Sequence, residues 1–237
     1  MRAMLLAAGR GERMRPLTDH TPKPLLAAGG KPLIVWHIEK LVRAGIRELV
    51  INHAHLGTQI EAALGDGSQF GAHIQYSPEG RALETAGGIA NALPMLCGAA
   101  GDDAPFAVIN GDIFCDYDFA RLTQRAAALQ TSGDAIHLVM VNNPPQHPNG
   151  DFGLQQGRVT DGPPKLTFSG IGIYRPSLFG HIARGSIAPL APLLRAQIAS
   201  GKASGEYHQS LWVDVGTPQR LEELDRQLAS TQNIPLT

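Results

Sequence analysis

The chain has 237 residues and a formal net charge of −1, so it can bury a substantial core and carries no bulk charge suited to nucleic acid or acidic lipids. Its two cysteines, Cys97 and Cys115, provide neither a disulfide framework nor the spacing of a zinc site. No stretch approaches the roughly 20 apolar residues of a membrane span, and the apolar run at residues 3–8 is too short for a signal peptide. We therefore expect a cytoplasmic protein that binds neither membranes nor nucleic acid.

Short apolar runs alternate with longer amphipathic segments over residues 1–141. This pattern predicts strands at residues 4–8, 47–52, 73–77, 106–110 and 135–141, and helices at residues 32–44, 56–64, 85–96 and 119–130. Such alternation is typical of right-handed crossovers between neighbouring strands. We expect an α/β fold in which a Rossmann-like, doubly wound and mostly parallel sheet has helices on both faces.

The regular alternation of predicted strands and helices ends after residue 142. The segment NNPPQHPNGDFG is rich in Pro, Asn and Gly, which is typical of a functional loop. Short strands are predicted at residues 154–156, 158–160 and 166–174, and helices at 187–200 and 218–229, with WVDVG between the two helices. Nothing marks a boundary, so we expect one domain over residues 1–237.

A glycine-rich turn follows the first predicted strand, in the segment LLAAGRGERMRPLTDHTPKPL at residues 5–25. Gly9 and Gly11 would let backbone N–H groups approach phosphate oxygens. The dinucleotide fingerprint requires a third glycine where Met14 stands, and the P-loop requires a Gly-Lys-Ser/Thr that is absent here. The turn therefore predicts a phosphate site that belongs to neither of these classes.

Two cations accompany this turn, Arg13 and Lys23. An arginine can hold two phosphate oxygens at once, whereas a lysine acts as a compact point charge. Prolines on both sides of Lys23 restrict its backbone, so we expect its side chain to be presented from a stiff loop. Together the two cations suit a triphosphate, while Arg10 and Arg15 fit solvated loop charges equally well.

The stretch LLAAGRGERMRPLT together with PKPL resembles the signature of the sugar-phosphate nucleotidyltransferases, and the resemblance covers essentially the whole chain. It implies the nucleotidyltransferase fold, with a small sugar-binding β subregion, and it implies that Arg13 and Lys23 are catalytic residues. The nucleotide-binding positions that it implies are Leu6, Ala8, Gly9, Gly11, Glu12, Arg13, Lys23, Thr85, Gly87 and Gly88.

The resemblance also implies a divalent metal, Mg²⁺, held by two aspartates. Asp112 follows the strand FAVIN and Asp214 lies in WVDVG, and ligands of open α/β sheets gather at such strand ends. Taken alone, a strand-end aspartate is more often a turn or capping residue, and Asp116 and Asp118 fit that role. We expect Asp112 and Asp214 to be the metal ligands, because both match family positions.

Two further positions resemble those that contact the sugar, Asn110 before Gly-Asp and Asp151 in NGDFGL. A buried amide such as Asn110 offers both donor and acceptor, which suits hydroxyl recognition. Glu84 departs from the glycine often present at its position in the family, and Thr85 could also simply cap the next helix. The family's Glu-Lys-Pro is missing, so Lys165 could be either a phosphate contact or a surface residue.

Several segments, among them INHAHLGTQI, YSPEG, LETAGGI and LTFSGI, are most similar to family members that use UTP and the cell-wall sugar N-acetylmuramate 1-phosphate. We therefore expect UTP and a sugar 1-phosphate as partners, in peptidoglycan recycling. Guanylyl transfer to mannose 1-phosphate, thymidylyl transfer to glucose 1-phosphate and a non-catalytic nucleotide-sugar-binding subunit stay open as alternatives. The sequence leaves the base, the sugar and the choice between a monomer and a small homo-oligomer open.

Overall fold

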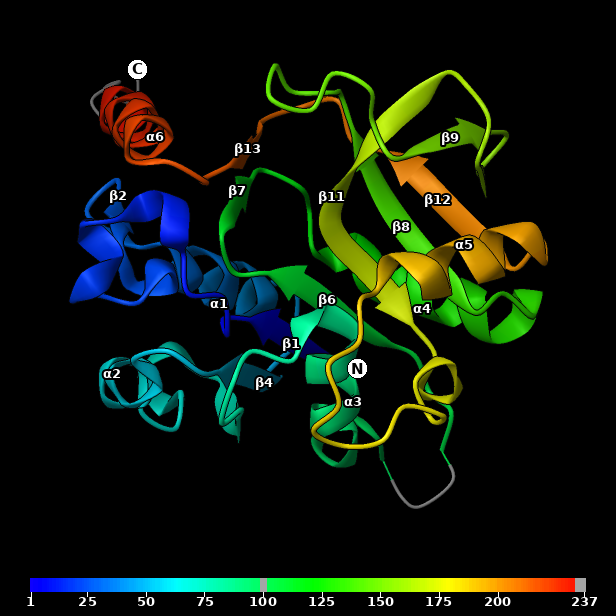
Figure 1. The fold of residues 1–237 in the computed structure, drawn as a ribbon, viewed down its shortest axis with the longest axis horizontal. Coiled ribbons are helices and arrows are strands. Elements are labelled where there is room, and N and C mark those ends of the chain that lie inside the picture. The colour runs from blue at the N-terminus through cyan, green and yellow to red at the C-terminus, as the bar shows by residue number, and fades with distance from the viewer. Residues whose placement is uncertain (99–101, 233–237) are drawn as a thin grey trace.

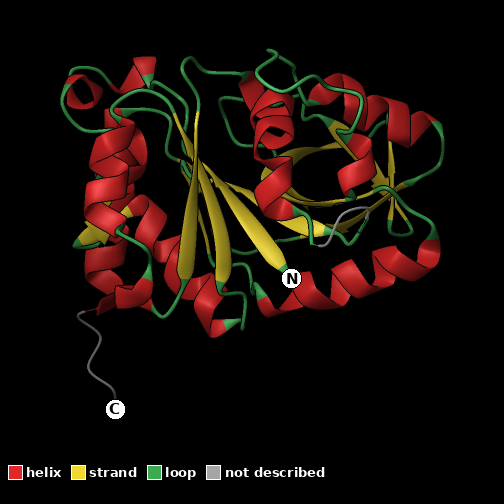
Figure 2. Ribbon diagram, turned by 90° about the horizontal axis from the view of Figure 1, so that it is seen from below, coloured by secondary structure: helices red, strands yellow, loops and turns green. Residues whose placement is uncertain are grey.

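The computed structural model describes residues 1–98 and 102–232. A nine-stranded sheet runs through the molecule, with helices on both sides of it (Figures 1 and 2). In spatial order its strands are β5 (His73–Pro78), β4 (Glu48–His53), β1 (Arg2–Leu6), β6 (Phe106–Asn110), β11 (Lys165–Tyr174), β8 (Ile136–Val141), β12 (Ala203–Tyr207), β10 (Arg158–Thr160) and β9 (Phe152–Gln155).

The sheet is parallel in one half and mixed in the other. Strands β5, β4, β1 and β6 are all parallel, as the strand–helix alternation predicts. Strand β11 then pairs antiparallel with both β6 and β8, β12 is parallel to β8, and β10 is antiparallel to β12 and β9. Part of the mixing arises because β9 and β10 are joined by the short turn at residues 156–157, and such a turn joins antiparallel neighbours. The α/β fold is confirmed, and its second half is less parallel than the sequence predicts.

Two layers of helices bury the two faces of the sheet. One face carries α1 (Leu33–Arg43), α2 (Gly57–Leu64) and α4 (Ala120–Ser132), and the other carries α3 (Glu84–Leu96) and α5 (Ala191–Ala199). Because successive side chains of a strand point to opposite faces, Ala3 and Leu5 of β1 pack into the first layer and Met4 into the second. The apolar runs in the sequence are thus strands that are buried on both sides.

A third apolar cluster lies at the end of the molecule where α6 (Pro218–Gln232) packs, beside β2 and β13 in Figure 1. Its core contains Leu221 and Leu224 of α6, together with Met14 and Val215. Two small sheets adjoin it: β2 (Ala27–Ala28) with β3 (Lys31–Pro32), and β7 (Ile113–Cys115) with β13 (Trp212–Asp214). The second of these sheets brings residues about 100 positions apart into register, and it determines the geometry of the cleft described below.

Three elements differ from the sequence-based expectation for identifiable reasons. The first strand ends at Leu6, because Ala7 already donates its N–H to the Asn52 side chain and not to the ladder. The helix expected at 187–200 begins at Ala191, after the proline-containing segment 187–190. Strand β12 is not predicted from the sequence, because Gly205 lowers its strand propensity; a Cβ on Gly205 would lie 2.7 Å from Val159 Cγ2.

Short 3₁₀ turns connect these elements, most of them around the glycine-rich turn: residues Glu12–Met14, Leu17–Asp19, Lys23–Leu25, Ser68–Phe70 and Pro176–Leu178. None of the helices within residues 1–98 and 102–232 combines the length and apolarity that crossing a membrane requires.

Candidate active site

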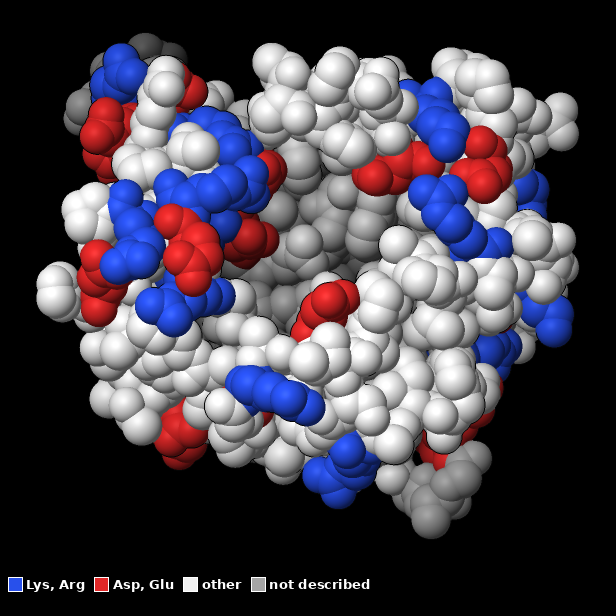
Figure 3. Space-filling view, viewed as in Figure 1, with Lys and Arg blue, Asp and Glu red and all other residues white. Residues whose placement is uncertain are grey.

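A cleft opens at the carboxyl ends of β1 and β6, and it is visible as the central hollow in Figure 3, with charged side chains on both rims. It has three connected lobes that share Asn110. The glycine lobe, about 370 Å³, is bordered by the turn after β1. The α5 lobe, about 420 Å³, is bordered by the start of α5, and the aspartate lobe, about 270 Å³, contains Asp112 and Asp214. The position matches the rule that open α/β sheets bind ligands beyond the carboxyl ends of their strands.

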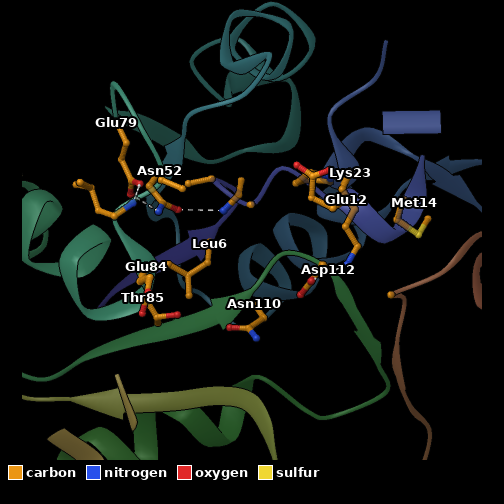
Figure 4. Close-up of a pocket in the computed structure, with 18 of the residues that line it drawn as sticks. Leu6, Glu12, Met14, Lys23, Asn52, Glu79, Glu84, Thr85, Asn110 and Asp112 are labelled. Carbon is orange, nitrogen blue, oxygen red and sulfur yellow. Dashed lines mark hydrogen bonds and ion pairs between the residues drawn. The ribbon is translucent and has the colours of Figure 1, made fainter. Parts of the chain in front are cut away.

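The glycine-rich turn forms one wall of the glycine lobe (Figure 4). Gly11 has a φ of +68°, and a Cβ there would lie 3.0 Å from Thr18 Cγ2. Thr18 Oγ1 in turn donates to the Gly11 carbonyl at 2.9 Å, which fixes the turn. At Gly9 no heavy atom lies within 4 Å of an added Cβ, so the backbone faces open space. The predicted residues of this segment, Leu6, Ala8, Gly9, Gly11, Glu12 and Arg13, all line the lobe.

Lys23 also lines the glycine lobe. Its side chain is 8% exposed, and Nζ lies 2.6 Å from Asp112 Oδ2. The flanking Pro22 has an extended backbone that leads directly into the 3₁₀ turn at Lys23–Leu25. A buried ammonium held by one carboxylate is a point charge poised to exchange that partner for a phosphate oxygen.

The structure brings Asp112 and Asp214 together, although 102 residues separate them in the chain. Strand β13 pairs with β7 so that Asp214 is opposite Ile113, and Val215 donates its N–H to the Asp112 carbonyl at 3.0 Å. Both side chains line the aspartate lobe. Asp214 also accepts from Arg220 Nη1 at 2.6 Å, an interaction that the sequence analysis missed.

Each of these carboxylates is paired with one cation, Asp112 with Lys23 and Asp214 with Arg220. Within the described residues no group of three or more Asp, Glu, His or Cys could form a cage for a metal. Two neighbouring carboxylates nevertheless fit Mg²⁺, which is usually bound through one or two carboxylates and takes its other ligands from waters and substrate phosphates.

Arg13 differs from the two paired cations. Its side chain is exposed, and within residues 1–98 and 102–232 it has no recorded ion pair or hydrogen bond. Gly216 leaves room for the Arg13 side chain, since a Cβ on Gly216 would lie 3.1 Å from Arg13 Nη2 and 2.7 Å from Arg220 Nη2. The guanidinium therefore borders both the glycine lobe and the Asp214–Arg220 pair with its donors available.

A buried polar network that the sequence analysis missed supports the far end of the glycine lobe (Figure 4). Asn52 Oδ1 accepts from the Ala7 N–H at 2.9 Å, and Asn52 Nδ2 donates to Glu79 Oε1 at 2.6 Å. Glu79 Oε2 accepts from the Leu83 N–H at 2.9 Å. The network joins the turn after β1 to the segment before α3, so it holds the two walls at a constant separation. In the sequence, the only indication of this network was the position of Asn52 at the end of a predicted strand.

The structure does not place Gly87 and Gly88 on the lining, where the family resemblance predicts nucleotide contacts; of that predicted group, Thr85 does line the glycine lobe. A Cβ on Gly87 would lie 2.2 Å from the Ser186 carbonyl oxygen, and one on Gly88 would lie 2.6 Å from Glu79 Oε1. Both glycines are buried in α3 and give room to neighbouring segments. Gly87 gives room to the segment around Ser186 and Ala188, and Gly88 gives room to the Asn52–Glu79 network; a nucleotide contact at either glycine stays a prediction.

Asn110 lies at the junction of the three lobes, at the end of β6. Gly170 of β11 leaves room for it, because a Cβ there would lie 2.6 Å from Asn110 Nδ2. Glu84 faces both the glycine and α5 lobes with a φ of +58°, a conformation that glycine adopts at much lower cost. This strain agrees with the sequence observation that a glycine is common at this position in the family.

Asp151 lines both the α5 and aspartate lobes. Its Oδ2 accepts from the Phe168 N–H at 2.8 Å, and its Oδ1 lies 3.1 Å from His147 Nε2. These contacts hold the carboxylate in a constant orientation at the edge of the cleft. Lys165 does not line any of the three lobes and instead lies 3.5 Å from Asp161 Oδ1.

Helix α1 holds β7, the strand that follows Asp112. His37 Nε2 donates to the Ile113 carbonyl at 2.8 Å, and Lys40 Nζ donates to the Cys115 carbonyl. Burial lowers the pKa of His37 from 6.5 to about 4, although its hydrogen bond to Ile113 acts in the opposite direction. His37 is therefore neutral near pH 7, with the proton on Nε2.

The depressed pKa of His37 makes folding stability depend on pH. Between pH 6.5 and about 4 the unfolded chain binds a proton at this position more readily than the folded chain, so stability falls as the pH falls. We expect the loss to reach about 3 kcal/mol at pH 4. In urea unfolding at pH 6.5 and 4.5, His37→Gln should flatten this dependence, whereas His73→Gln, at an exposed histidine, should retain it. An unchanged slope in His37→Gln would contradict the assignment.

Comparison with known proteins gives consistent matches. Residues 2–161 match the family model described as Nucleotidyl transferase. The N-acetylmuramate alpha-1-phosphate uridylyltransferase of Neisseria meningitidis serogroup B is 55% identical over 228 residues, which are 94% of this chain and 96% of that protein. The mannose-1-phosphate guanyltransferase of Hypocrea jecorina is 29% identical, and this chain spans 62% of its length.

The fold also matches solved structures. A Bacillus anthracis protein described as a glucose-1-phosphate thymidylyltransferase superposes with a TM-score of 0.83 at 19% identity, over 100% of this chain and 97% of that one. HddC from Yersinia pseudotuberculosis gives a TM-score of 0.74 at 17% identity over 95% of this chain and 98% of its own. At these identities the likeness concerns the fold alone.

Proposed function

Because the chain belongs to the nucleotidyl transferase family, we propose that it transfers the uridylyl group of UTP to N-acetylmuramate α-1-phosphate, giving UDP-N-acetylmuramate and pyrophosphate. The observation that carries this proposal is the 55% identity to the Neisseria uridylyltransferase, which extends over nearly the full length of both proteins. The product is a nucleotide-activated cell-wall sugar, so we place the reaction in the cytoplasmic recycling of peptidoglycan. We further propose that residues 1–237 act as one nucleotidyltransferase domain.

In the proposed reaction an ionised phosphate oxygen of the sugar 1-phosphate attacks the α-phosphorus of UTP. The new bond joins that oxygen to the α-phosphorus, the bond to the bridging α–β oxygen breaks, and its electron pair leaves with pyrophosphate. No residue has to remove a proton, because the attacking oxygen is already charged. Catalysis then consists of positioning and charge stabilisation.

The cleft residues divide these tasks among themselves. The backbone at Gly9 and Gly11 faces the triphosphate, and Arg13 holds the departing pyrophosphate with its available donors. Lys23 exchanges Asp112 for the α-phosphate. Asn110 and Asp151 bind the sugar, because both line the lobes beyond the reacting phosphates.

Members of this family typically use a divalent metal, and we propose Mg²⁺ here. Asp112 and Asp214 would hold it, and it would neutralise phosphate oxygens that otherwise repel one another. Retention of both carboxylates beside Lys23 and Arg13 favours an enzyme over a non-catalytic nucleotide-sugar-binding subunit, which has no need of that pair.

A substrate panel tests this proposal. Pyrophosphate release is measured for UTP, dTTP, GTP and ATP, each with the 1-phosphates of N-acetylmuramate, N-acetylglucosamine, glucose and mannose. We expect the highest kcat/KM for UTP with N-acetylmuramate α-1-phosphate. A preference for GTP with mannose 1-phosphate or dTTP with glucose 1-phosphate would replace this assignment with the corresponding alternative, and no release from any pair would favour the binding subunit.

A further inference from the structure

The α5 lobe has an unusual charge distribution. Of its lining residues in the described part of the chain, Arg195 is the only one with a positive charge, whereas Glu84 and Asp151 are acidic. The rest of the lining is mainly apolar, with Phe152 and Leu194 among its residues. Without Arg195 this lobe would repel an anionic ligand.

Arg195 is presented from a well-anchored helix. The preceding Leu194 is buried in the core beneath α5, so the helix cannot easily move away from the lobe. The guanidinium carbon of Arg195 lies 5.1 Å from the centroid of the Phe152 ring, a cation–π contact that orients the planar head.

Arg195 forms an ion pair with Asp161 that is weak and that Asp161 shares with a second cation. Nη1 of Arg195 lies 2.6 Å from Asp161 Oδ1, but the two side chains are 50% and 58% exposed, and such surface pairs contribute little. The same Asp161 oxygen also lies 3.5 Å from Lys165 Nζ, so the aspartate keeps a counter-charge if Arg195 turns to another anion. An arginine has five N–H donors, and this pair uses one of them.

N-acetylmuramate differs from N-acetylglucosamine by a lactyl ether on O3, which adds a carboxylate. The C1 phosphate belongs beside Lys23 and Asp112, and O3 lies toward the other end of the sugar ring. From Asn110, at the junction of the lobes, the α5 lobe extends away from the glycine turn. We propose that Arg195 binds the lactyl carboxylate and thereby selects N-acetylmuramate 1-phosphate over sugars that lack this group; this inference rests on the proposed function.

The test compares two sugars in two proteins. At saturating UTP, kcat/KM is measured with the 1-phosphates of N-acetylmuramate and N-acetylglucosamine, for the wild type and for Arg195→Gln. We expect Arg195→Gln to lose roughly tenfold or more in kcat/KM with N-acetylmuramate 1-phosphate, mainly through KM, because a charge-assisted bidentate contact disappears. With N-acetylglucosamine 1-phosphate the change should stay within about twofold, since that sugar has no carboxylate to lose. Where its turnover is slow, its inhibition constant against N-acetylmuramate 1-phosphate takes the place of kcat/KM.

Two further variants sharpen the comparison. Arg195→Lys keeps the charge without the planar fork and should recover part of the lost affinity. Arg226→Gln, at an exposed arginine of α6, should leave both sugars unaffected. Equal losses with both sugars, or no loss with either, would overturn the role of Arg195 while leaving uridylyl transfer intact. A wild type that does not use N-acetylmuramate 1-phosphate would overturn the proposed function, and this inference with it.

Discussion

Asp112→Asn is expected to lower kcat about 1,000-fold, because the loss of a carboxylate that we propose to hold Mg²⁺ would remove several kcal/mol of transition-state stabilisation. UTP should still bind within a few-fold of the wild-type Kd, since the glycine turn and Arg13 are untouched. Half-saturation by Mg²⁺ should move to a higher concentration. The measurements are steady-state pyrophosphate release over a Mg²⁺ series and calorimetric titration with UTP.

Asp112 also neutralises the buried Lys23, so the variant needs controls for structure. Asp214→Asn removes the other carboxylate, which is paired with Arg220 instead, and it should show the same separation of kcat from UTP binding. Asp66→Asn, at a fully exposed carboxylate that hydrogen-bonds Ser68, should behave like the wild type. Turnover by Asp112→Asn within tenfold of the wild type would contradict the metal assignment.

Arg13→Ala is expected to reduce kcat/KM for UTP about 100-fold, because we propose that this cation binds the leaving pyrophosphate, where it would stabilise charge that develops in the transition state. Product inhibition by pyrophosphate should weaken in parallel, and this readout would not change if Arg13 had only a structural role. Arg13→Lys should recover only part of the loss, since an ammonium cannot hold two oxygens in fork geometry.

Arg15 provides the matched control for Arg13. It lies two residues away, is paired with Asp19 Oδ1 at 2.7 Å and does not line the glycine lobe. Arg15→Ala should therefore remain within about threefold of the wild type, as surface ion pairs contribute little. Similar losses in both arginine variants would show that general positive charge, and not the position of Arg13, supports the reaction.

The parallel half of the sheet was predictable because its signals are local. Each buried strand there is a short apolar run, and each crossover helix has an apolar face, so Ala3, Met4 and Leu5 already define a strand that is covered on both sides. Strand β12 was missed because its sequence, ASGEY, has low strand propensity and depends on its pairing with β8 and β10. Gly205 lies where Val159 comes too close for a side chain, a fact that no local pattern records.

The candidate site was likewise predictable where its residues belong to a local sequence pattern, and not where they act through tertiary contacts. The motif at residues 5–25 pointed to Arg13 and Lys23, the family resemblance pointed to Asp112, and all three line one lobe of the cleft. Arg220 and the Asn52–Glu79 network could not be predicted from the sequence, because a residue that acts by holding another side chain has no motif of its own. Gly87 and Gly88 show that a glycine in a motif-like segment can also serve close packing, which the sequence alone does not reveal.

The fate of the α-phosphate of UTP tests direct uridylyl transfer. The wild-type protein is incubated with UTP labelled at the α-phosphorus, N-acetylmuramate α-1-phosphate and Mg²⁺, and the products are separated. Direct transfer predicts that the label enters UDP-N-acetylmuramate in an amount equal to the pyrophosphate released, with no label on the protein. Label recovered as free UMP, as a covalent protein adduct, or as unreacted UTP would contradict direct uridylyl transfer to the sugar phosphate.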